Sequence, residues 1–501
     1  MSDTAEYAGS EVPTSSPYSP APLRGDALAA AIALFCFALI IFFAKSSEST
    51  LPATDAAAHA AYAMSTTAHG FVSQFPSNLP VTYFALTGWV MRLLGSTTWV
   101  AKLVPGLFSV GTVMLTFTLG RTLRSNVLGI VAAIILVLSR DFIRDGLNAH
   151  LDGVMLFFIL ASFIFWERGK YALAGVAAGL GIWFKSPVAL VLYPSMLIVH
   201  LLRLDVFKKM KPWCVSLAIA LGVGALIWIF TGVFGSWDIV RDYWVSFFSA
   251  TPVPAEVQHQ FDPLMFVDVL RGSYLPWSVF LAVGIVWSIV FFRFRRAEFV
   301  VPLSAAAIMI VGISCLRVKY PHYFVPAYPF LALIAAQPLT YWLEKKESDF
   351  YRGFTVLTML AATVILVSPI QLAPESFPSL RRFIPYIQAA GGDERDEVVM
   401  VEGGQPYGHF NDYANLIRFY TGKTTKLADC QTVNLAAQKR EVKWILISGK
   451  NYSSCLDDSV RKLFPKEIID GDQHLLGRPG VISSGDGGKT DLTPLNQDLK
   501  H

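Results

Sequence analysis

The chain of 501 residues has little charge and few cysteines for its length. Charged residues make up only 16% of it, whereas about 25% is usual in soluble globular proteins. The five cysteines show no spacing typical of a metal-binding motif. The net charge of +4 is small and dispersed, so it does not indicate a nucleic-acid partner. These absences exclude a metal site built on cysteine spacing and leave a nucleic-acid function without support.

Apolar residues, in contrast, are abundant. They make up 53% of the chain, and the mean hydropathy of +0.47 lies on the membrane side of the soluble average. Apolar runs that could cross a membrane lie near residues 27–44, 98–120, 126–139, 152–166, 171–184, 187–202, 213–232, 274–292, 299–316, 322–343 and 354–370. Several are shorter than the roughly 20 residues of a perpendicular span. The pattern predicts an all-α polytopic membrane bundle of about eleven transmembrane helices.

Basic residues gather in alternate loops between these runs. They are Arg121, Arg124, Arg168, Lys170, Arg203, Lys208, Lys209, Lys211, Arg293, Arg295, Arg296, Lys345 and Lys346. The positive-inside rule places these loops and the N-terminus in the cytoplasm. The other loops, including residues 45–97 and 235–273, and everything after about residue 369 are then predicted to lie outside.

The two ends of the chain differ from its apolar middle. Residues 1–25 are rich in Ser, Pro and Ala without periodicity, which indicates a disordered cytoplasmic tail, and residues 26–370 hold the predicted bundle. In residues 371–501 we expect a small α/β domain outside the membrane, with short buried strands at 398–401 and 444–447, a helix near 415–420, and a loose end from about 483. Cys430 and Cys455 fall in this part and could pair in an oxidising compartment.

The two long outside loops carry features of a membrane surface. In the first, the apolar spacing of residues 81–94 suits a helix lying along the membrane. The second holds Trp237, Tyr243 and Trp244, which are residue types enriched as interface anchors.

Charged residues also collect on the predicted outer side, where a basic excess is unusual. They are Asp55, Arg140, Asp141, Arg144, Asp145, Asp152, Lys185, Arg271, Arg317, Lys319 and His322. A lipid phosphate at the outer leaflet would account for the cations, because Arg and Lys both bind phosphate well. A carboxylate could accept the proton of an attacking hydroxyl while cations stabilise the departing phosphate.

Each of these residues also has an ordinary structural interpretation. Asp55 and Asp152 could cap the helices that follow them. Lys185, in the turn before Pro187, could extend into the outer headgroups. The arginines after residue 139 could pair with the aspartates beside them, at about 0–1 kcal/mol if exposed. His59 and His69 share a loop with Asp55 and could bind zinc, although their spacing is a weak signal.

Several short motifs occur in a definite order along residues 27–340. They are Asp55 with Tyr62, a Pro-rich segment leading into aromatic residues at Leu79–Phe84, Lys102 ahead of Pro105, Asp152 at the start of a span, Lys185-Ser186-Pro187, Leu275–Ser278, and Lys319-Tyr320-Pro321-His322-Tyr323. In this order they resemble the bacterial relatives of dolichyl-phosphate-mannose:protein mannosyltransferases, a group that includes the lipid A aminoarabinose transferases. These are GT-C-type membrane glycosyltransferases. The acidic pair of that family is a single aspartate here, because Ala56 takes the second place.

The resemblance implies transfer of a sugar from a polyprenyl-phosphate carrier to an acceptor outside a bacterial inner (plasma) membrane. It implies Asp55 as the general base, inversion at the anomeric carbon, and Asp152 as the residue that positions either the loop of Asp55 or the acceptor. The implied ligands of the donor phosphate are Lys185, Arg140, Lys319 and Lys102. The implied substrate contacts are Tyr62, Tyr83, His322 and Tyr323. No metal ligand or cofactor is assigned, a divalent cation stays open, and the acceptor is a protein, a lipid or a polysaccharide.

Two other classes of function are also considered. A lipid or small-solute transporter places polar groups near the midplane on interrupted helices, whereas here the charges gather at one surface. A non-catalytic envelope scaffold, with the outer domain as its binding module, would leave Asp55 and the outer cations unexplained.

Overall fold

The structure is a computed structural model of the chain. It describes residues 22–23, 25–44, 59–64, 81–148, 150–203, 205–234, 236–248, 264–290, 296–315, 321–368, 383, 387, 398–401, 417–421, 423, 425–439, 441–448, 452, 454–470 and 473–478. Asp55 and Lys319 lie outside these residues, as do His69, most of the predicted N-terminal tail and the predicted loose end from residue 483.

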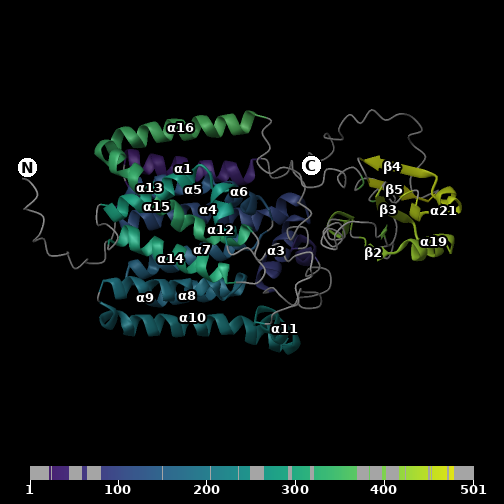
Figure 1. The fold of residues 1–501 in the computed structure, drawn as a ribbon, viewed down its shortest axis with the longest axis horizontal. Helices are drawn as coiled ribbons and strands as arrows, with labels where there is room; N and C mark the ends of the chain where they lie inside the picture. Colours follow the sequence, from purple (N-terminus) through teal and green to yellow (C-terminus); the bar gives the residue numbers. More distant parts are fainter. Residues whose placement is uncertain are drawn as a thin grey trace, which may run out of the picture. The chain divides into compact units, whose positions relative to one another are not determined.

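The chain forms two compact units, which are described separately. The first contains Met1–Ser49 and Tyr62–Pro374, and the second contains Thr50–Ala61 and Glu375–His501. In Figure 1 the first unit is a stack of helices that run nearly parallel to one another, and the second contains a small sheet with helices beside it.

The first unit is built from apolar helices. They are α1 (Gly25–Phe43), α3 (Val81–Leu94), α4 (Thr98–Leu123), α5 (Asn126–Val137), α6 (Arg140–Leu147), α7 (Asp152–Glu167), α8 (Tyr171–Phe184), η1 (Pro187–Val191), α9 (Leu192–Leu202), α10 (Val206–Phe234), α11 (Trp237–Phe248), α12 (Met265–Arg271), α13 (Trp277–Val290), α14 (Ala297–Ser314), η4 (Pro321–Ala327), α15 (Tyr328–Leu343), η5 (Glu344–Lys346) and α16 (Glu347–Val367). Every apolar run of the sequence overlaps one of these helices, and the run 171–184 coincides with α8.

Five helical stretches in the described residues are long and apolar enough to cross a membrane. A sixth is added if α5 and α6, which are bent by 69° at a short break, form one span. Four shorter apolar helices accompany them: Val81–Leu94, Tyr171–Phe184, Pro187–Leu202 and Trp277–Val290. The chain is thus a multi-pass membrane protein, while the number eleven stays a prediction.

Close helix contacts hold the bundle together. Helix α8 packs between α7 and α10, α4 packs against α5 and α7, and α1 packs between α4 and α16 (Figure 1). A Cβ atom at Gly175 would lie 2.4 Å from the Ser216 carbonyl oxygen, and one at Gly179 would lie 2.8 Å from that of Ala220. Small residues therefore let α8 and α10 approach closely, as is common between membrane helices.

Part of the basic residue set has a structural role. Arg124, at the end of α4, forms an ion pair with Glu344 at 2.5 Å and donates to the side-chain oxygen of Gln337 at 3.0 Å. Ser125 donates to the other carboxylate oxygen of Glu344 at 2.5 Å. This network links α4 and α5 to the end of α15.

The second unit contains a five-stranded sheet in the order β2-β1-β3-β5-β4. The strands are β1 (Val398–Val401), β2 (Thr425–Ala428), β3 (Trp444–Ser448), β4 (Lys466–Asp470) and β5 (Gln473–Gly477). Strand β1 is parallel to both of its neighbours, and β5 is antiparallel to β3 and β4. The strands predicted at 398–401 and 444–447 are β1 and β3.

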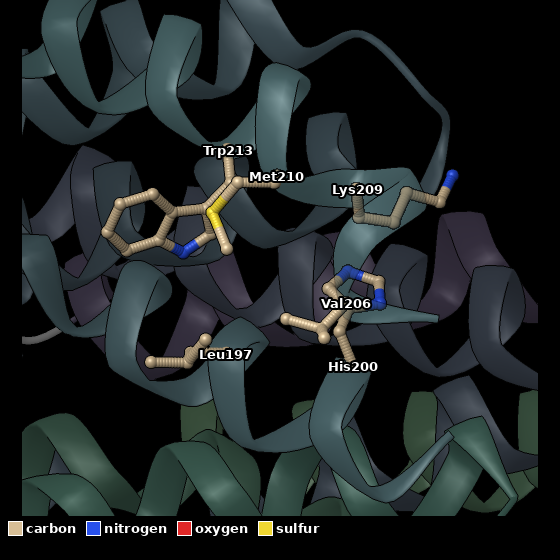
Figure 2. A pocket seen from close by; sticks show the side chains of 6 residues that line it. All are labelled: Leu197, His200, Val206, Lys209, Met210 and Trp213. Carbon is tan, nitrogen blue, oxygen red and sulfur yellow. The ribbon is translucent and has the colours of Figure 1, made fainter. Parts of the chain in front are cut away.

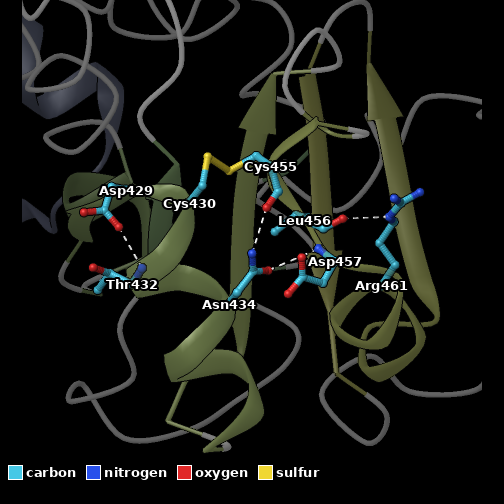
Figure 3. Close-up of a disulfide and its surroundings, with 8 residues drawn as sticks. All are labelled: Asp429, Cys430, Thr432, Asn434, Cys455, Leu456, Asp457 and Arg461. Carbon is cyan, nitrogen blue, oxygen red and sulfur yellow. Dashed lines mark hydrogen bonds between the residues drawn. A yellow bond between two sulfur atoms is a disulfide. The ribbon is translucent and has the colours of Figure 1, made fainter.

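Helices and a disulfide accompany the sheet in the described part of this unit, where residues 417–421 are also helical, close to the helix predicted near 415–420. Helix α19 (Cys430–Gln438) is tied to the segment before α21 (Asp458–Leu463) by a bond between Cys430 and Cys455, which confirms the predicted pair (Figure 3). The Asn434 side chain donates to the Cys455 carbonyl oxygen at 2.8 Å. Asp429 caps α19 by accepting from the Thr432 amide at 2.7 Å, and this hydrogen bond lowers the pKa of Asp429.

Candidate active site

The centre of the candidate site is an ion pair between two neighbouring helices of the bundle. Asp152 lies in the first turn of α7, and Lys185 follows the last residue of α8. The Lys185 amine lies 2.5 Å from the Asp152 carboxylate. The Asp152 side chain is 3% exposed and that of Lys185 is 21% exposed. The N-cap of α7 is Leu151, so Asp152 uses its carboxylate to hold Lys185 and not to cap its own helix.

Aromatic residues hold Lys185 from other sides. Its amine lies 5.4 Å from the centre of the Tyr323 ring, within the range of a cation–π contact. The Tyr243 hydroxyl donates to the Lys185 carbonyl oxygen at 3.2 Å. Tyr243 is buried, with its ring 4.2 Å from that of Trp228, so it packs inside the protein and the prediction that it anchors the membrane interface is wrong. The short turn after α8 is therefore held in place at both its side chain and its backbone.

Two further carboxylates lie beside the ion pair. The segment 140–147, predicted as a short loop, is helix α6, and it places Asp141 and Asp145 one turn apart. Asp141 accepts from the Tyr328 hydroxyl at 3.1 Å and lies 3.6 Å from Arg144. Asp145 is only 2% exposed, and neither of its carboxylate oxygens has a hydrogen-bond partner among the described residues.

These charges belong to one electrostatic site. Asp145 interacts with Asp152 and Asp141, which repel it, and with Arg144 and Lys185, which attract it. Three carboxylates thus face two cations, of which only Lys185 is held inside the site. A buried carboxylate without a hydrogen bond is costly, so Asp145 is available to accept a hydrogen bond from a bound molecule or a mobile side chain.

Two histidines lie beside this site, His322 in η4 and His150 between α6 and α7. The His322 ring lies 5.5 Å from the His150 ring and 4.8 Å from the Tyr323 ring. The predicted residues His322 and Tyr323 are therefore brought to the same region as Lys185. Within the part of the chain that the structure describes, no group of three His, Cys, Asp or Glu residues is arranged to hold a metal ion.

The remaining predicted residues are spread over other places. The rings of Tyr62 and Tyr83 both contact that of Phe84, with ring centres 5.8 and 5.6 Å from it. Lys102 is buried in α4, with 1% of its surface exposed. Arg140 is exposed at the start of α6 and forms no ion pair with the described residues. Asp55 and Lys319 lie outside the described residues, so their positions stay predictions.

Sequence reasoning overlooked some residues of this site. Tyr328 and His150 were not among the candidates, and Asp145 was named as one of the outer charges and as a local partner of an arginine, without a site role of its own. The spacing of Asp141 and Asp145 was the available signal, because residues four apart share one face of a helix. No local signal existed for Tyr328, which lies 187 residues from Asp141 in the sequence.

The fold and the site define the class of this chain. It is a multi-pass membrane protein that gathers carboxylates and a lysine where the helices α6, α7 and α8 begin or end. The matches with known proteins support the GT-C family of membrane glycosyltransferases. The family model described as dolichyl-phosphate-mannose-protein mannosyltransferase matches residues 78–228, a region that contains both Asp152 and Lys185.

Solved structures share the fold. ArnT from Cupriavidus metallidurans bound to undecaprenyl phosphate is 15% identical, with a TM-score of 0.64 over 91% of this chain and 99% of that chain. The archaeal oligosaccharyltransferase AglB from Archaeoglobus fulgidus is 11% identical, with a TM-score of 0.54 over 94% of this chain and 75% of that chain. At such identities the likeness concerns the fold alone.

Curated relatives match part of the chain. An uncharacterized protein of Aquifex aeolicus is 26% identical over 312 residues, which cover 60% of each protein. An undecaprenyl phosphate-alpha-4-amino-4-deoxy-L-arabinose arabinosyl transferase of Pseudomonas fluorescens is 23% identical over 207 residues, which cover 41% of this chain and 36% of that protein. The chain therefore spans less than two thirds of the length of these relatives.

Proposed function

We propose that this protein transfers a glycosyl group from a polyprenyl-phosphate-linked sugar to an acceptor on the outer side of a bacterial inner membrane. The observation that supports this most directly is the Asp152–Lys185 ion pair, which lies within the region matched by the mannosyltransferase family model. The structural neighbour ArnT binds undecaprenyl phosphate, and its fold resembles that of this chain. A lysine beside carboxylates suits a reaction in which a phosphate leaves and a hydroxyl loses its proton.

In the proposed reaction, the acceptor oxygen attacks the anomeric carbon of the donor. The bond between that carbon and the phosphate oxygen breaks, and the polyprenyl phosphate leaves with the bonding electrons. Asp55 takes the proton of the acceptor hydroxyl. Because the attack comes from the side opposite the phosphate, the configuration at the anomeric carbon inverts.

Lys185 is the proposed contact of the donor phosphate. An ammonium group has three N–H donors, so Lys185 can keep its bond to Asp152 and still donate to a phosphate oxygen. Its amine is partly exposed, whereas the Asp152 carboxylate is buried. Asp152 then acts as a positioning residue, and Arg140 and Lys319 are proposed to add charge near the phosphate.

Residues of the neighbouring elements are proposed to contact the sugar or the acceptor. His322 and Tyr323 lie next to the lysine, and Tyr62 and Tyr83 lie together in a second aromatic cluster. The two carboxylate oxygens of Asp145 have no hydrogen-bond partner among the described residues, and they suit a hydroxyl or amino group of a sugar.

A direct assay tests this function. Membranes that contain the protein are incubated with a radiolabelled polyprenyl-phosphate sugar, and label is measured in protein, lipid and polysaccharide fractions. We expect label in one fraction with the native chain and none with Asp55→Asn. The matched control Asp457→Asn removes an exposed charge in the second unit and should leave transfer intact. Label that stays on the carrier with the native chain, or transfer that persists in Asp55→Asn, would contradict the function or the assigned base.

A further inference from the structure

The backbone of the turn that carries Lys185 is weakly fixed by its own helix. The Lys185 amide lies 3.4 Å from the Gly181 carbonyl oxygen, which is longer than the roughly 2.7–3.2 Å of most N–H···O hydrogen bonds. Lys185 is the C-cap of α8, so its carbonyl oxygen has no partner within that helix. Ser186 is extended, and Pro187 has no amide hydrogen. Contacts from outside α8 therefore decide where the backbone of Lys185 lies.

The hydroxyl of Tyr243, on α11, supplies one such contact. It donates to the Lys185 carbonyl oxygen at 3.2 Å. The ring of Tyr243 is buried, with its centre 4.2 Å from the ring of Trp228 on α10 and 5.3 Å from the ring of Trp244. Close packing restricts the movement of a buried ring. The Tyr243 hydroxyl is therefore held at the end of α8.

A second hydrogen bond joins α10 to the end of α8. The side chain of Trp183, two residues before Lys185, donates to the Val223 carbonyl oxygen at 2.6 Å. Trp183 also packs against the apolar cluster that contains Tyr243. Helix α11 follows α10 directly in the bundle (Figure 1). The pair α10 and α11 thus holds the end of α8 through two hydrogen bonds and one shared apolar cluster.

Helix α11 has one buried side and one exposed side. Val240 and Tyr243, three residues apart, are buried and share a side of the helix. Asp238 and Arg241 are exposed and form an ion pair with each other at 2.9 Å. Phenylalanine would fill the space of the Tyr243 ring on the buried side, so the contribution of the hydroxyl is its hydrogen bonding.

We infer that Tyr243 is a positioning residue for the donor phosphate and acts through Lys185. This inference rests on the proposed function, in which the Lys185 amine contacts that phosphate. The hydrogen bond from Tyr243 fixes the backbone of Lys185, while Asp152 and Tyr323 hold its side chain. Without the Tyr243 hydroxyl the turn moves more freely, and the amine spends less time where the phosphate binds. Donor binding then weakens, and acceptor binding does not change.

Transfer kinetics of the full chain with Tyr243→Phe test the inference. The KM for the polyprenyl-phosphate sugar should rise about fivefold, the effect of losing one hydrogen bond, and the KM for the acceptor should not change. In a Lys185→Ala background the same substitution should add no further rise, because the group that Tyr243 positions is gone. A rise of the same size in both backgrounds would mean that Tyr243 does not act through Lys185.

The matched control is Tyr193→Phe. The Tyr193 hydroxyl also donates to a backbone carbonyl oxygen, that of Ser216, at 2.8 Å. Its ring contacts that of Trp213, which lines a small pocket at the start of α10 (Figure 2). No residue of that pocket belongs to the candidate active site. The donor KM of Tyr193→Phe should equal that of the native chain, and a rise equal to that of Tyr243→Phe would mean a general loss of packing.

Amide hydrogen exchange of the full chain in detergent gives a measurement that does not depend on transfer. The Lys185 amide should exchange about fivefold faster in Tyr243→Phe than in the native chain, again for one hydrogen bond, and at the native rate in Tyr193→Phe. If the native chain transfers no sugar, the proposed function fails, and the exchange of this amide still decides whether Tyr243 holds the turn. Unchanged exchange of the amide, or a native donor KM in Tyr243→Phe, would overturn the inference.

Discussion

The two partners of the buried ion pair should differ in how badly their loss destabilises the protein. Breaking a buried pair by removing one partner costs about 3–5 kcal/mol, because the other charge is left uncompensated. Lys185 is one-fifth exposed, so the lower end of this range applies here. Asp152→Asn leaves Lys185 near Asp145, whose carboxylate oxygens accept no hydrogen bond from the described residues and can become its new partner. Lys185→Met instead leaves the buried aspartates with Arg144, which is half exposed.

We therefore expect Lys185→Met to cost about 3 kcal/mol and Asp152→Asn to cost about half as much or less. Adding Asp145→Asn to Lys185→Met should restore part of the loss, since one buried negative charge disappears. Asp238→Asn is the matched control, because it breaks an exposed pair with Arg241 that is worth about 0–1 kcal/mol.

The assay is thermal unfolding of the purified variants in one detergent at neutral pH. A chain of this size is not expected to unfold in two states, so the order of the midpoints is the measurement and no absolute free energy is taken from it. If the unfolding midpoint of Asp152→Asn lies below that of Lys185→Met, Asp145 does not replace Asp152 as the partner of Lys185. A Lys185→Met midpoint equal to that of the surface control would refute the ion pair as a buried interaction.

Four further expectations can be tested separately. Asp55→Asn should lower glycosyl transfer by about a hundredfold or more, with protein level and membrane insertion unchanged, and near-normal turnover would show that the residue caps its helix. Lys185→Ala should raise the KM for the polyprenyl-phosphate sugar more than the KM for the acceptor, and Lys185→Arg should recover only part, because a planar fork replaces a point charge. An unchanged KM for the polyprenyl-phosphate sugar in Lys185→Ala would show that Lys185 has a structural role. Replacing both Cys430 and Cys455 by serine should destabilise the second unit by roughly 3 kcal/mol, since the bond closes a loop with a sequence separation of 25. Thiol labelling of the denatured native chain with and without reductant checks that the bond forms. Equal labelling in the two conditions would disprove the bond. A reporter that is active only outside the cytoplasm, fused after His501, should be active, and an inactive fusion would reverse the predicted orientation.

Local features of the sequence were predicted well where one segment carries the signal by itself. The run 171–184 is helix α8, and the apolar spacing of residues 81–94 predicted helix α3. Apolar side chains drive such segments into helices because their backbone groups must be paired inside an apolar medium. The pair Cys430 and Cys455 was also predicted, since only these two cysteines lie in the polar C-terminal part.

Prediction failed where a short polar segment depends on its neighbours. Residues 140–147 carry four charges and were predicted as a loop, yet they form helix α6 with Asp141 and Asp145 buried. Tyr243 was predicted at the membrane interface, yet it packs on Trp228 and holds the backbone of Lys185. Asp141 meets Tyr328 across 187 residues, and Tyr243 meets the Lys185 backbone across 58 residues, so composition alone favoured an exposed position.

By itself, then, the sequence determined that this protein is an apolar helical bundle of the membrane, where most of its helices lie, and which residue types are available for transfer chemistry. These properties follow from runs of side chains that are contiguous along the chain. Only the tertiary structure decided which charges meet. Asp152 and Lys185 are 33 residues apart, and Tyr328 reaches Asp141 across 187 residues. Such contacts depend on how α6, α7, α8 and α15 pack together, and the cost of burying a charge makes the choice of partner a property of that packing.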